Sequence, residues 1–345
     1  MKCQLVAQGF KRGNCLTRMP DGKLRNSCEA ILKKDKSGLW HRVITSAHLS
    51  RPEHYFSIYM SGCNFNCLKC HSHEFTKNFN GEWLSTDEIA ELCRNYEEMV
   101  TVKEPVERAL DWYATELCRC CGSCIINNSP SEFCPQKLTP DQVLKSPQGF
   151  GPARNIVGYT GGDLACCPEF YAQLTKKIKS ETKNLHVLFE TNGYGLTPKN
   201  LELLKASGVD SFWLDIKAFH DKVHKKLCGV SNKRVLELPS ELLEYGFQLE
   251  VLSLFIPGWV EKDQICKIAE LLVNVDAKIP FTLLAFFPEY KLLDCRTPTV
   301  VEMIQSYLAV KDAGLKNVRI GNIGIFARTS DELALLHAIV DSEDL

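Results

Sequence analysis

The chain has 345 residues, a formal net charge of −1 at neutral pH, 45% apolar residues and 24% charged residues. This composition is typical of a globular protein, and it excludes the strong charge bias of a nucleic-acid or membrane-surface binder. We therefore expect no nucleic-acid partner and no membrane partner. The N-terminus lacks the apolar core of a signal peptide, and no apolar run reaches about 18 residues.

Seventeen cysteines are the unusual feature of the composition. Secreted scaffolds rich in disulfides are usually short, whereas this chain is long. Without a signal sequence we expect a cytoplasmic location, in an oxygen-poor cell, where thiols stay reduced. Clustered cysteines in that compartment are more often metal ligands than disulfides.

Short β-rich segments alternate with helical patterns from about residue 55 onward. Residues 54–60 form the first expected strand, and residues 84–100 form an expected helix with Ser85 and Glu88 as a capping box. The remaining expected elements are strands at 155–160, 185–190, 211–217, 248–256, 281–286 and 317–321, a helix after Pro168, and a helix at 198–207 ended by Gly208.

This alternation predicts an α/β fold in which helices cover a parallel sheet. Six or seven units favour a partial (β/α)6-type barrel, in which chemistry takes place at the C-terminal ends of the strands. The expected domains are an N-terminal extension at 1–52, a barrel at 53–328 that includes a cysteine-rich insertion at 101–150, and a C-terminal helix at 329–345.

Three cysteines follow the first expected strand, in the stretch "YMSGCNFNCLKCHSHEF" (59–75). Cys63, Cys67 and Cys70 are separated by three residues and then by two. A closed zinc site and an iron–sulfur cubane each take four protein ligands, so three thiolates leave one metal corner for a substrate. The alternative is a zinc site completed by His71 or His73.

This spacing directly after a first barrel strand resembles the signature of the radical SAM enzymes, and the resemblance extends over roughly residues 54–325. It implies that the three cysteines hold a 4Fe-4S cluster whose fourth iron binds S-adenosylmethionine (SAM). It also implies one-electron cleavage of SAM to a 5′-deoxyadenosyl radical, with the protein supplying position and shielding.

Two further motifs resemble the same family. "YTGGDLACCPEFY" (159–171) is similar to its glycine-rich motif, which implies that Gly161, Gly162 and Asp163 hold the methionyl ammonium group; the family usually has Glu in place of this Asp. "FETNGYG" (189–195) is similar to the Asp-Thr-Asn-Gly motif of glycyl-radical activating enzymes. It implies that Glu190, Thr191 and Asn192 face the SAM ribose or a nearby cation. The alternatives are an ordinary Gly-Gly turn and an Asn-Gly strand–turn–helix connection.

Residues 214–237 closely resemble the stretch after the fourth strand of pyruvate formate-lyase activating enzymes. The resemblance places polar site positions at Asp215, Lys217, His224, Asn232 and Arg234. His224 is the candidate catalytic residue among them, although a lone histidine on a helix is more often structural.

Two positions depart from the family pattern. Leu252 stands where the activating enzymes carry an arginine near the SAM carboxylate. Lys69 stands where the family usually has an aromatic residue against adenine, so that only its alkyl stem remains for packing. The segments 9–24 and 286–299 are more similar to the AmmeMemoRadiSam-system radical SAM proteins, which belong to the same activase-like branch.

The insertion contains the run "CRCCGSCIINNSPSEFCP" (118–135). Cys118, Cys121, Cys124 and Cys134 resemble the ferredoxin run that ends in Cys-Pro, which implies an auxiliary 4Fe-4S cluster. A four-thiolate zinc site is the alternative, and a different register that includes Cys120 stays open.

The remaining cysteines carry weaker expectations. Cys166 and Cys167 are candidates for a further metal site, Cys167 is a candidate catalytic thiol, and both are alternatively small buried residues. A second auxiliary site is a candidate role for Cys3, Cys15 and Cys28. No function is expected of Cys93, Cys228, Cys266 and Cys295.

The resemblance implies a radical SAM enzyme that modifies a protein substrate by abstracting hydrogen from a backbone Cα, as glycyl-radical activases do. Its electron donor would be a ferredoxin or flavodoxin. The alternative is a cobalamin-dependent radical SAM C-methyltransferase that acts on a protein residue, such as one in methyl-coenzyme M reductase. A third interpretation, an iron–sulfur carrier or zinc scaffold, predicts no saturable SAM binding.

Overall fold

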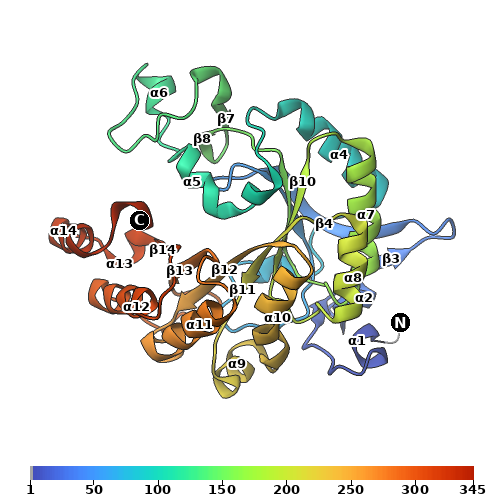
Figure 1. Cartoon of the computed structure of the whole chain (residues 1–345). Helices are drawn as coiled ribbons and strands as arrows, with labels where there is room; N and C mark the ends of the chain where they lie inside the picture. Colours follow the sequence, from blue (N-terminus) through green and yellow to red (C-terminus); the bar gives the residue numbers. More distant parts are fainter. Residues whose placement is uncertain (1–2) are drawn as a thin grey trace.

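The computed structural model describes residues 3–345 and has a mixed α/β architecture. A ten-stranded sheet forms its centre, with the order β14-β13-β12-β11-β10-β9-β5-β4-β3 and with β6 paired to β4. Helices cover the outer face of this curved sheet (Figure 1).

Seven consecutive strands of the sheet are parallel, as the alternating sequence pattern predicts. These strands are β5 (Phe56–Met60), β9 (Ile156–Gly161), β10 (His186–Thr191), β11 (Ser211–Asp215), β12 (Gln248–Phe255), β13 (Phe281–Ala285) and β14 (Val318–Gly321). The strand order across residues 3–345 does not return from β14 to β5, so the fold is compatible with a partial barrel.

An antiparallel edge completes the sheet beyond β5. It consists of β3 (Leu32–Lys34), β4 (Trp40–Leu49) and β6 (Glu82–Ser85). The ten-residue β4 lies inside the segment that the sequence assigns to an extension outside the barrel. Arg42, in the first half of β4, interrupts the apolar pattern of the strand. Its side chain is nevertheless fully buried, and it donates a hydrogen bond to the carbonyl oxygen of Gly162 (2.6 Å).

The expected helices form with the predicted end signals. Ser85 caps α4 (Thr86–Met99) through a reciprocal capping box with Glu88, and Gly208 ends α8 in the left-handed region with φ +96°. The other long helices are α7 (Pro168–Glu181), α8 (Pro198–Ser207), α9 (Asp221–Cys228), α10 (Lys233–Glu244), α11 (Lys262–Val275), α12 (Val300–Asp312) and α14 (Ser330–Ile339). None of the helices within residues 3–345 has the length and apolarity needed to cross a membrane.

Burial alternates along the parallel strands. On β11, Phe212 and Leu214 are fully buried beneath the helices, whereas Trp213 and Asp215 on the opposite face are only half-buried. Leu252 and Leu254 on β12 follow the same pattern. The inner face of the curved sheet therefore keeps partial access to solvent, as a barrel that admits a substrate requires.

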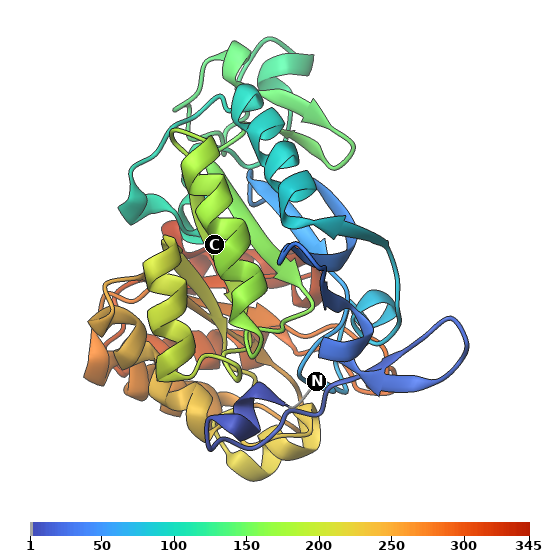
Figure 2. The same ribbon diagram turned by 90° about the vertical axis from the view of Figure 1, so that its right-hand side faces the viewer.

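Two segments with short elements lie at opposite ends of the molecule (Figure 1; Figure 2 shows the N-terminal segment near the lower edge). The N-terminal segment holds α1 (Gln4–Ala7), β1 (Leu16–Arg18), β2 (Leu24–Asn26) and α2 (Ser27–Ala30). The insertion holds α5 (Ala114–Leu117), α6 (Ser123–Ile126), β7 (Leu144–Ser146), β8 (Gly149–Gly151) and the 3-10 turns Val106–Arg108, Asp111–Tyr113 and Pro140–Gln142. The remaining short elements are α3 (His73–Thr76), α13 (Ile323–Phe326) and the 3-10 turn Ser342–Asp344.

Candidate active site at the C-terminal ends of the strands

The three-cysteine loop connects β5 to α3 at the C-terminal end of the parallel strands. Cys67 is 8% exposed, whereas Cys63 and Cys70 are half-buried. The sulfur of Cys63 accepts hydrogen bonds from the backbone N–H of Phe65 (3.4 Å) and from Nδ2 of Asn192 (3.8 Å). The loop therefore contacts the end of β10 as well as the end of β5.

The end of α9 holds the loop from the other side. The backbone N–H of Asn66 donates to the carbonyl of Cys228 (3.0 Å), and that of Leu68 donates to the carbonyl of Leu227 (2.8 Å). The thiol of Cys228 hydrogen-bonds to Cys67 and, against the effect of burial, lowers the Cys67 pKa to about 7, with a further contribution from Lys217. Thiolate is the form that ligates metals, so this neighbourhood favours metal binding at Cys67, whereas burial raises the pKa of Cys63 to about 11.

The contact with Cys67 makes Cys228 a site residue that the sequence analysis missed. Its position in the activase-like stretch 214–237 was the available signal. A single cysteine at a helix end gives no indication of its partner, because the contact joins residues 161 positions apart in the chain only after folding.

The Gly-Gly-Asp motif lies directly against the three-cysteine loop. A Cβ on Gly162 would lie 2.0 Å from the carbonyl oxygen of Gly62, so only glycine fits there. The carboxylate of Asp163 accepts hydrogen bonds from the Thr191 hydroxyl (2.7 Å) and the Asn192 backbone N–H (2.9 Å). Asp163 thus joins the motif to the end of β10, and its carboxylate is engaged with protein donors.

The three residues of the Glu-Thr-Asn motif point in different directions. Asn192 donates from Nδ2 to Oδ1 of Asn64 (2.7 Å) and lies beside Cys63, as a role near the cluster loop requires. Glu190 instead lies on the inner face of the sheet, where it accepts hydrogen bonds from the hydroxyls of Tyr55 (2.9 Å) and Thr160. Burial raises the pKa of Glu190 to about 8.

Asp215 and Lys217 form an ion pair at the end of β11. Burial acts to lower the pKa of Lys217, but Asp215 and Cys67 raise it overall, so the ammonium group stays charged beside the loop. His224 on α9 is fully buried, its Nδ1 lies 2.8 Å from the carbonyl oxygen of Val230, and its ring packs edge-on against Phe65. Its contacts support the loop from behind.

Lys69 is almost completely buried, and its Nζ atom has no hydrogen-bond partner. The ammonium group lies 3.3 Å from the ring centre of Phe287. Burial lowers the Lys69 pKa to about 8. Leu252 pairs with Asp215 across β11 and β12 and supplies no charge. The cations near the loop include Lys69, Lys217 and Lys77, which interacts with both Cys63 and Cys67.

The donor chemistry of the loop fits a thiolate-bound metal cluster. The strand ends bring together three cysteines, Lys217, which stabilises an anion, and a Gly-Gly turn that packs on the loop. The thiols do not already surround a common point: across residues 3–345, no group of three or more His, Cys, Asp or Glu side chains has the geometry of a metal site. The assignment of Cys63, Cys67 and Cys70 as ligands stays a prediction.

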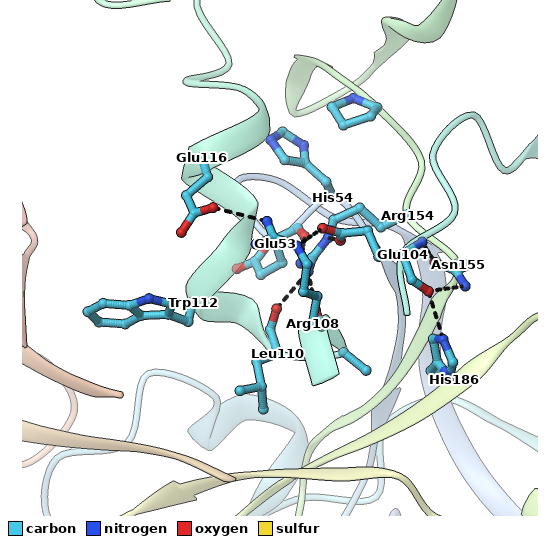
Figure 3. A network of polar contacts seen from close by, with 12 residues as sticks. Glu53, His54, Glu104, Arg108, Leu110, Trp112, Glu116, Arg154, Asn155 and His186 are labelled. Atoms are coloured by element: carbon cyan, nitrogen blue, oxygen red, sulfur yellow. Dashed lines mark hydrogen bonds and ion pairs between the residues drawn. The ribbon is translucent and has the colours of Figure 1, made fainter. Parts of the chain in front are cut away.

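The insertion is anchored at the opposite, N-terminal ends of the strands (Figure 3). Arg154 lies two residues before the start of β9, and its guanidinium donates to Glu104 (2.5 Å) and to the carbonyls of Arg108 and Leu110 (both 2.8 Å). The ring Nε2 of His186, the first residue of β10, lies 2.9 Å from the carbonyl oxygen of Glu104. The insertion therefore covers the floor of the barrel.

The insertion cysteines lie beside the start of β5. The carbonyl oxygen of Cys118 lies 3.2 Å from Nε2 of His54, and this contact positions Cys118. The thiol of Cys124 is close enough to those of Cys118, Cys134 and Cys121 for their charges to interact, and burial raises its pKa. Cys120 belongs to the same group, because its thiol hydrogen-bonds with that of Cys118 and lies 3.7 Å from Nε2 of His54. The four-cysteine site and the register that includes Cys120 both stay predictions.

Comparison with known proteins agrees with these motifs. Residues 117–272 match the family model described as the Radical SAM superfamily, a span that includes the Gly-Gly-Asp and Glu-Thr-Asn motifs but not the three-cysteine loop. A putative glycyl-radical enzyme activating enzyme of Methanocaldococcus jannaschii is 31% identical over 131 residues, which are 37% of this chain and 48% of that protein. The match thus spans about half the length of this relative.

The pyruvate formate-lyase 1-activating enzyme of Escherichia coli K12 is 26% identical over 175 residues, which are 49% of this chain and 69% of that protein. Among solved structures, a domain of the pyruvate-formate lyase-activating enzyme from Bacteroides vulgatus is 22% identical with a TM-score of 0.41, covering 48% of this chain and 98% of that domain. The resemblance of this chain to the radical SAM superfamily, and to the glycyl-radical activating enzymes within it, is therefore confirmed.

Proposed function

We propose that this chain is a radical SAM enzyme that modifies a protein substrate by abstracting hydrogen from a backbone Cα. The observation that carries the proposal is the convergence of the three-cysteine loop, the Gly-Gly-Asp motif and Asn192 at the C-terminal ends of β5, β9 and β10. The named activating-enzyme relatives supply the reaction class and the protein substrate.

Cys63, Cys67 and Cys70 would hold a 4Fe-4S cluster with SAM. When bound, this pair supplies a 5′-deoxyadenosyl radical after transfer of one electron from a ferredoxin- or flavodoxin-type donor. Lys217 stabilises the thiolate of Cys67, and Asp163 fixes the end of β10 against the loop.

The inner face of the sheet would receive the substrate segment. Trp213, Leu252 and Leu254 are half-buried on this face, which suits an extended peptide that must lie close to the strand ends. His224 acts as a positioning residue through Phe65, because its ring contacts the loop rather than the open face.

The comparisons do not favour the cobalamin-dependent methyltransferase, because the relatives named above are activating enzymes. The cytoplasmic location also stays a prediction.

The test uses the full-length chain reconstituted without oxygen and supplied with SAM and a one-electron reductant. We expect 5′-deoxyadenosine by mass spectrometry, and no increase in S-adenosylhomocysteine when cobalamin is added. A protein extract labelled with deuterium at glycine Cα, from cells that encode the chain, should transfer deuterium to the nucleoside. SAM cleavage without any deuterium transfer would contradict Cα abstraction from glycine, and no cleavage by cluster-loaded protein would contradict the reaction itself.

A further inference from the structure

Thiols outside the sites described so far converge at the start of α7. Cys166 and Cys167 end the loop after the Gly-Gly-Asp motif, and they are 8% and 3% exposed. The thiol of Cys167 hydrogen-bonds with the thiols of both Cys166 and Cys28. The N-terminal extension therefore places one of its cysteines directly against the barrel.

The small β1–β2 hairpin explains why Cys15 joins this group. Cys15 directly precedes β1, Cys28 follows β2 after one intervening residue, and the backbone N–H of Ser27 donates to the carbonyl of Cys15 (3.1 Å). Both cysteines thus lie at the open end of the hairpin. The thiol of Cys15 is close enough to those of Cys28 and Cys3 for their charges to interact.

Neighbouring thiols and burial raise the pKa of Cys15, Cys28 and Cys167, although two features near these thiols favour the deprotonated form. The guanidinium of Arg12 hydrogen-bonds with Cys15. Cys167 is the N-cap residue of the fourteen-residue α7, whose positive end stabilises an anion, and its side chain makes no capping hydrogen bond. Asp163 beside Cys166 and Glu169 beside Cys167 act in the opposite sense.

The N-terminal segment also has little regular structure to hold it in place. Its helices have four residues each and its two hairpin strands have three. Segments this small usually need a disulfide or a metal in addition to a core, and the cysteines named here are free thiols.

We propose that Cys15, Cys28 and Cys167, with Cys166 or Cys3 as the fourth ligand, form a thiolate site for one soft divalent cation, Zn²⁺ or Fe²⁺. Thiolate-rich sites select this class of ion. As at the three-cysteine loop, these thiols do not yet surround a common point in the described residues. Cys167 pairs with Cys28 and Cys166 through hydrogen bonds, and metal binding replaces these contacts with metal–sulfur bonds and releases the thiol protons. The ion fastens the N-terminal segment to the start of α7.

This position connects the proposed site to the three-cysteine loop. The hydroxyl of Ser27, next to Cys28, donates to the carbonyl of Cys63 (3.1 Å). A Cβ on Gly13 would lie 2.5 Å from the carbonyl oxygen of Asn64, so the extension packs tightly on the loop. Fastening the extension therefore also supports the backbone that carries Cys63.

The test is a metal count on the full-length chain, incubated without oxygen with Zn²⁺ alone or Fe²⁺ alone, desalted and measured by elemental mass spectrometry. Sulfide is omitted so that iron–sulfur clusters do not assemble. Relative to the wild type, Cys28→Ser/Cys167→Ser should lose about one metal ion per chain in at least one arm. The control Cys266→Ser/Cys295→Ser, whose cysteines lie outside this group, should lose none. Equal metal content in the first variant and the wild type, in both arms, would overturn the proposal.

A second variant tests the proposal independently, in case the double variant does not fold. Cys15→Ser removes one half-buried thiol, and Zn²⁺ should raise the melting temperature of the wild type by more than that of this variant. An equal rise in both would overturn the site. Neither readout needs SAM or a reductant, so failure of this site is distinguishable from failure of the proposed radical chemistry.

Discussion

The cysteines of the three-cysteine loop and those of the insertion lie in two different environments. Around the loop, Cys67, Cys228 and His224 are buried, and three strand ends converge on the backbone. In the insertion, Cys121 is exposed, and no helix or strand exceeds four residues. Cys63, Cys70, Cys118, Cys124 and Cys134 are all half-buried, so the two groups differ most between the buried Cys67 and the exposed Cys121.

The two groups also lie at opposite ends of β5. His54, just before this strand, contacts Cys118, and Cys63 follows its end. At about 3.3 Å per residue, the strand alone separates the groups by roughly 15 Å. A metal held by the insertion is therefore too distant to ligate SAM bound at the loop, and the comparison predicts separate functions.

The largest effect should come from the loop itself. Cys67→Ala removes the thiolate that Cys228 and Lys217 stabilise, so 5′-deoxyadenosine formation should fall to the uncatalysed background while the iron of the insertion remains. Product formation and iron per chain are measured on the same sample. Retained SAM cleavage would show that the loop is not the reactive centre.

Breaking the anchor of the insertion should have the largest effect on stability. Glu104→Gln leaves the fully buried Arg154 guanidinium without its counter-ion, which should cost about 3 kcal/mol of unfolding free energy. The matched control is Glu181→Gln at the more exposed Arg94–Glu181 pair, which should cost less than about 1 kcal/mol. Urea unfolding gives both values, and equal costs would contradict the anchoring role.

Removing one insertion thiol should have a smaller effect on the reaction. Cys124→Ala should reduce the iron content by the auxiliary cluster, because its thiol is close enough to those of Cys118, Cys121 and Cys134 for their charges to interact. With a chemical reductant, SAM cleavage should stay within a few-fold of the wild type. A complete loss of cleavage, with the loop cluster intact by iron count, would contradict the separation of functions.

The smallest effect is expected at Glu250, and it concerns how stability depends on pH. Burial raises the pKa of Glu250 to about 8 from an ordinary 4.5, so the folded chain holds a proton there that the unfolded chain releases. Stability should therefore fall as the pH rises between these values. Glu250→Gln removes this loss and should make the pH dependence of the unfolding free energy shallower. Thermal unfolding from pH 5 to 9 measures it, and an unchanged slope would contradict the assignment.

Local patterns in the sequence predicted many of the helices and strands described above. The capping box at Ser85, the helix end at Gly208 and the seven parallel strands all depend on residues near one another in the chain, and the structure confirms them. The cysteine spacing likewise placed the loop directly after β5.

Contacts that depend on tertiary packing were not predictable. The strand β4 was missed because a buried Arg42 interrupts its apolar run, and its partner Gly162 lies 120 residues away. The pairing of Cys67 with Cys228 and of Cys28 with Cys167 arises only when distant elements meet. The hydrogen bond between Tyr55 and Glu190 likewise joins residues 135 positions apart, and the role near SAM that the family resemblance implies for Glu190 stays a prediction.

The most direct test of the central claim is the effect of SAM on the electron paramagnetic resonance spectrum of each reduced centre in isolation. Cys124→Ala keeps the loop cluster, and Cys67→Ala keeps the auxiliary cluster. We predict that SAM changes the spectrum of Cys124→Ala and leaves that of Cys67→Ala unchanged. A SAM-dependent change in Cys67→Ala, with none in Cys124→Ala, would assign the reactive centre to the insertion and contradict the account.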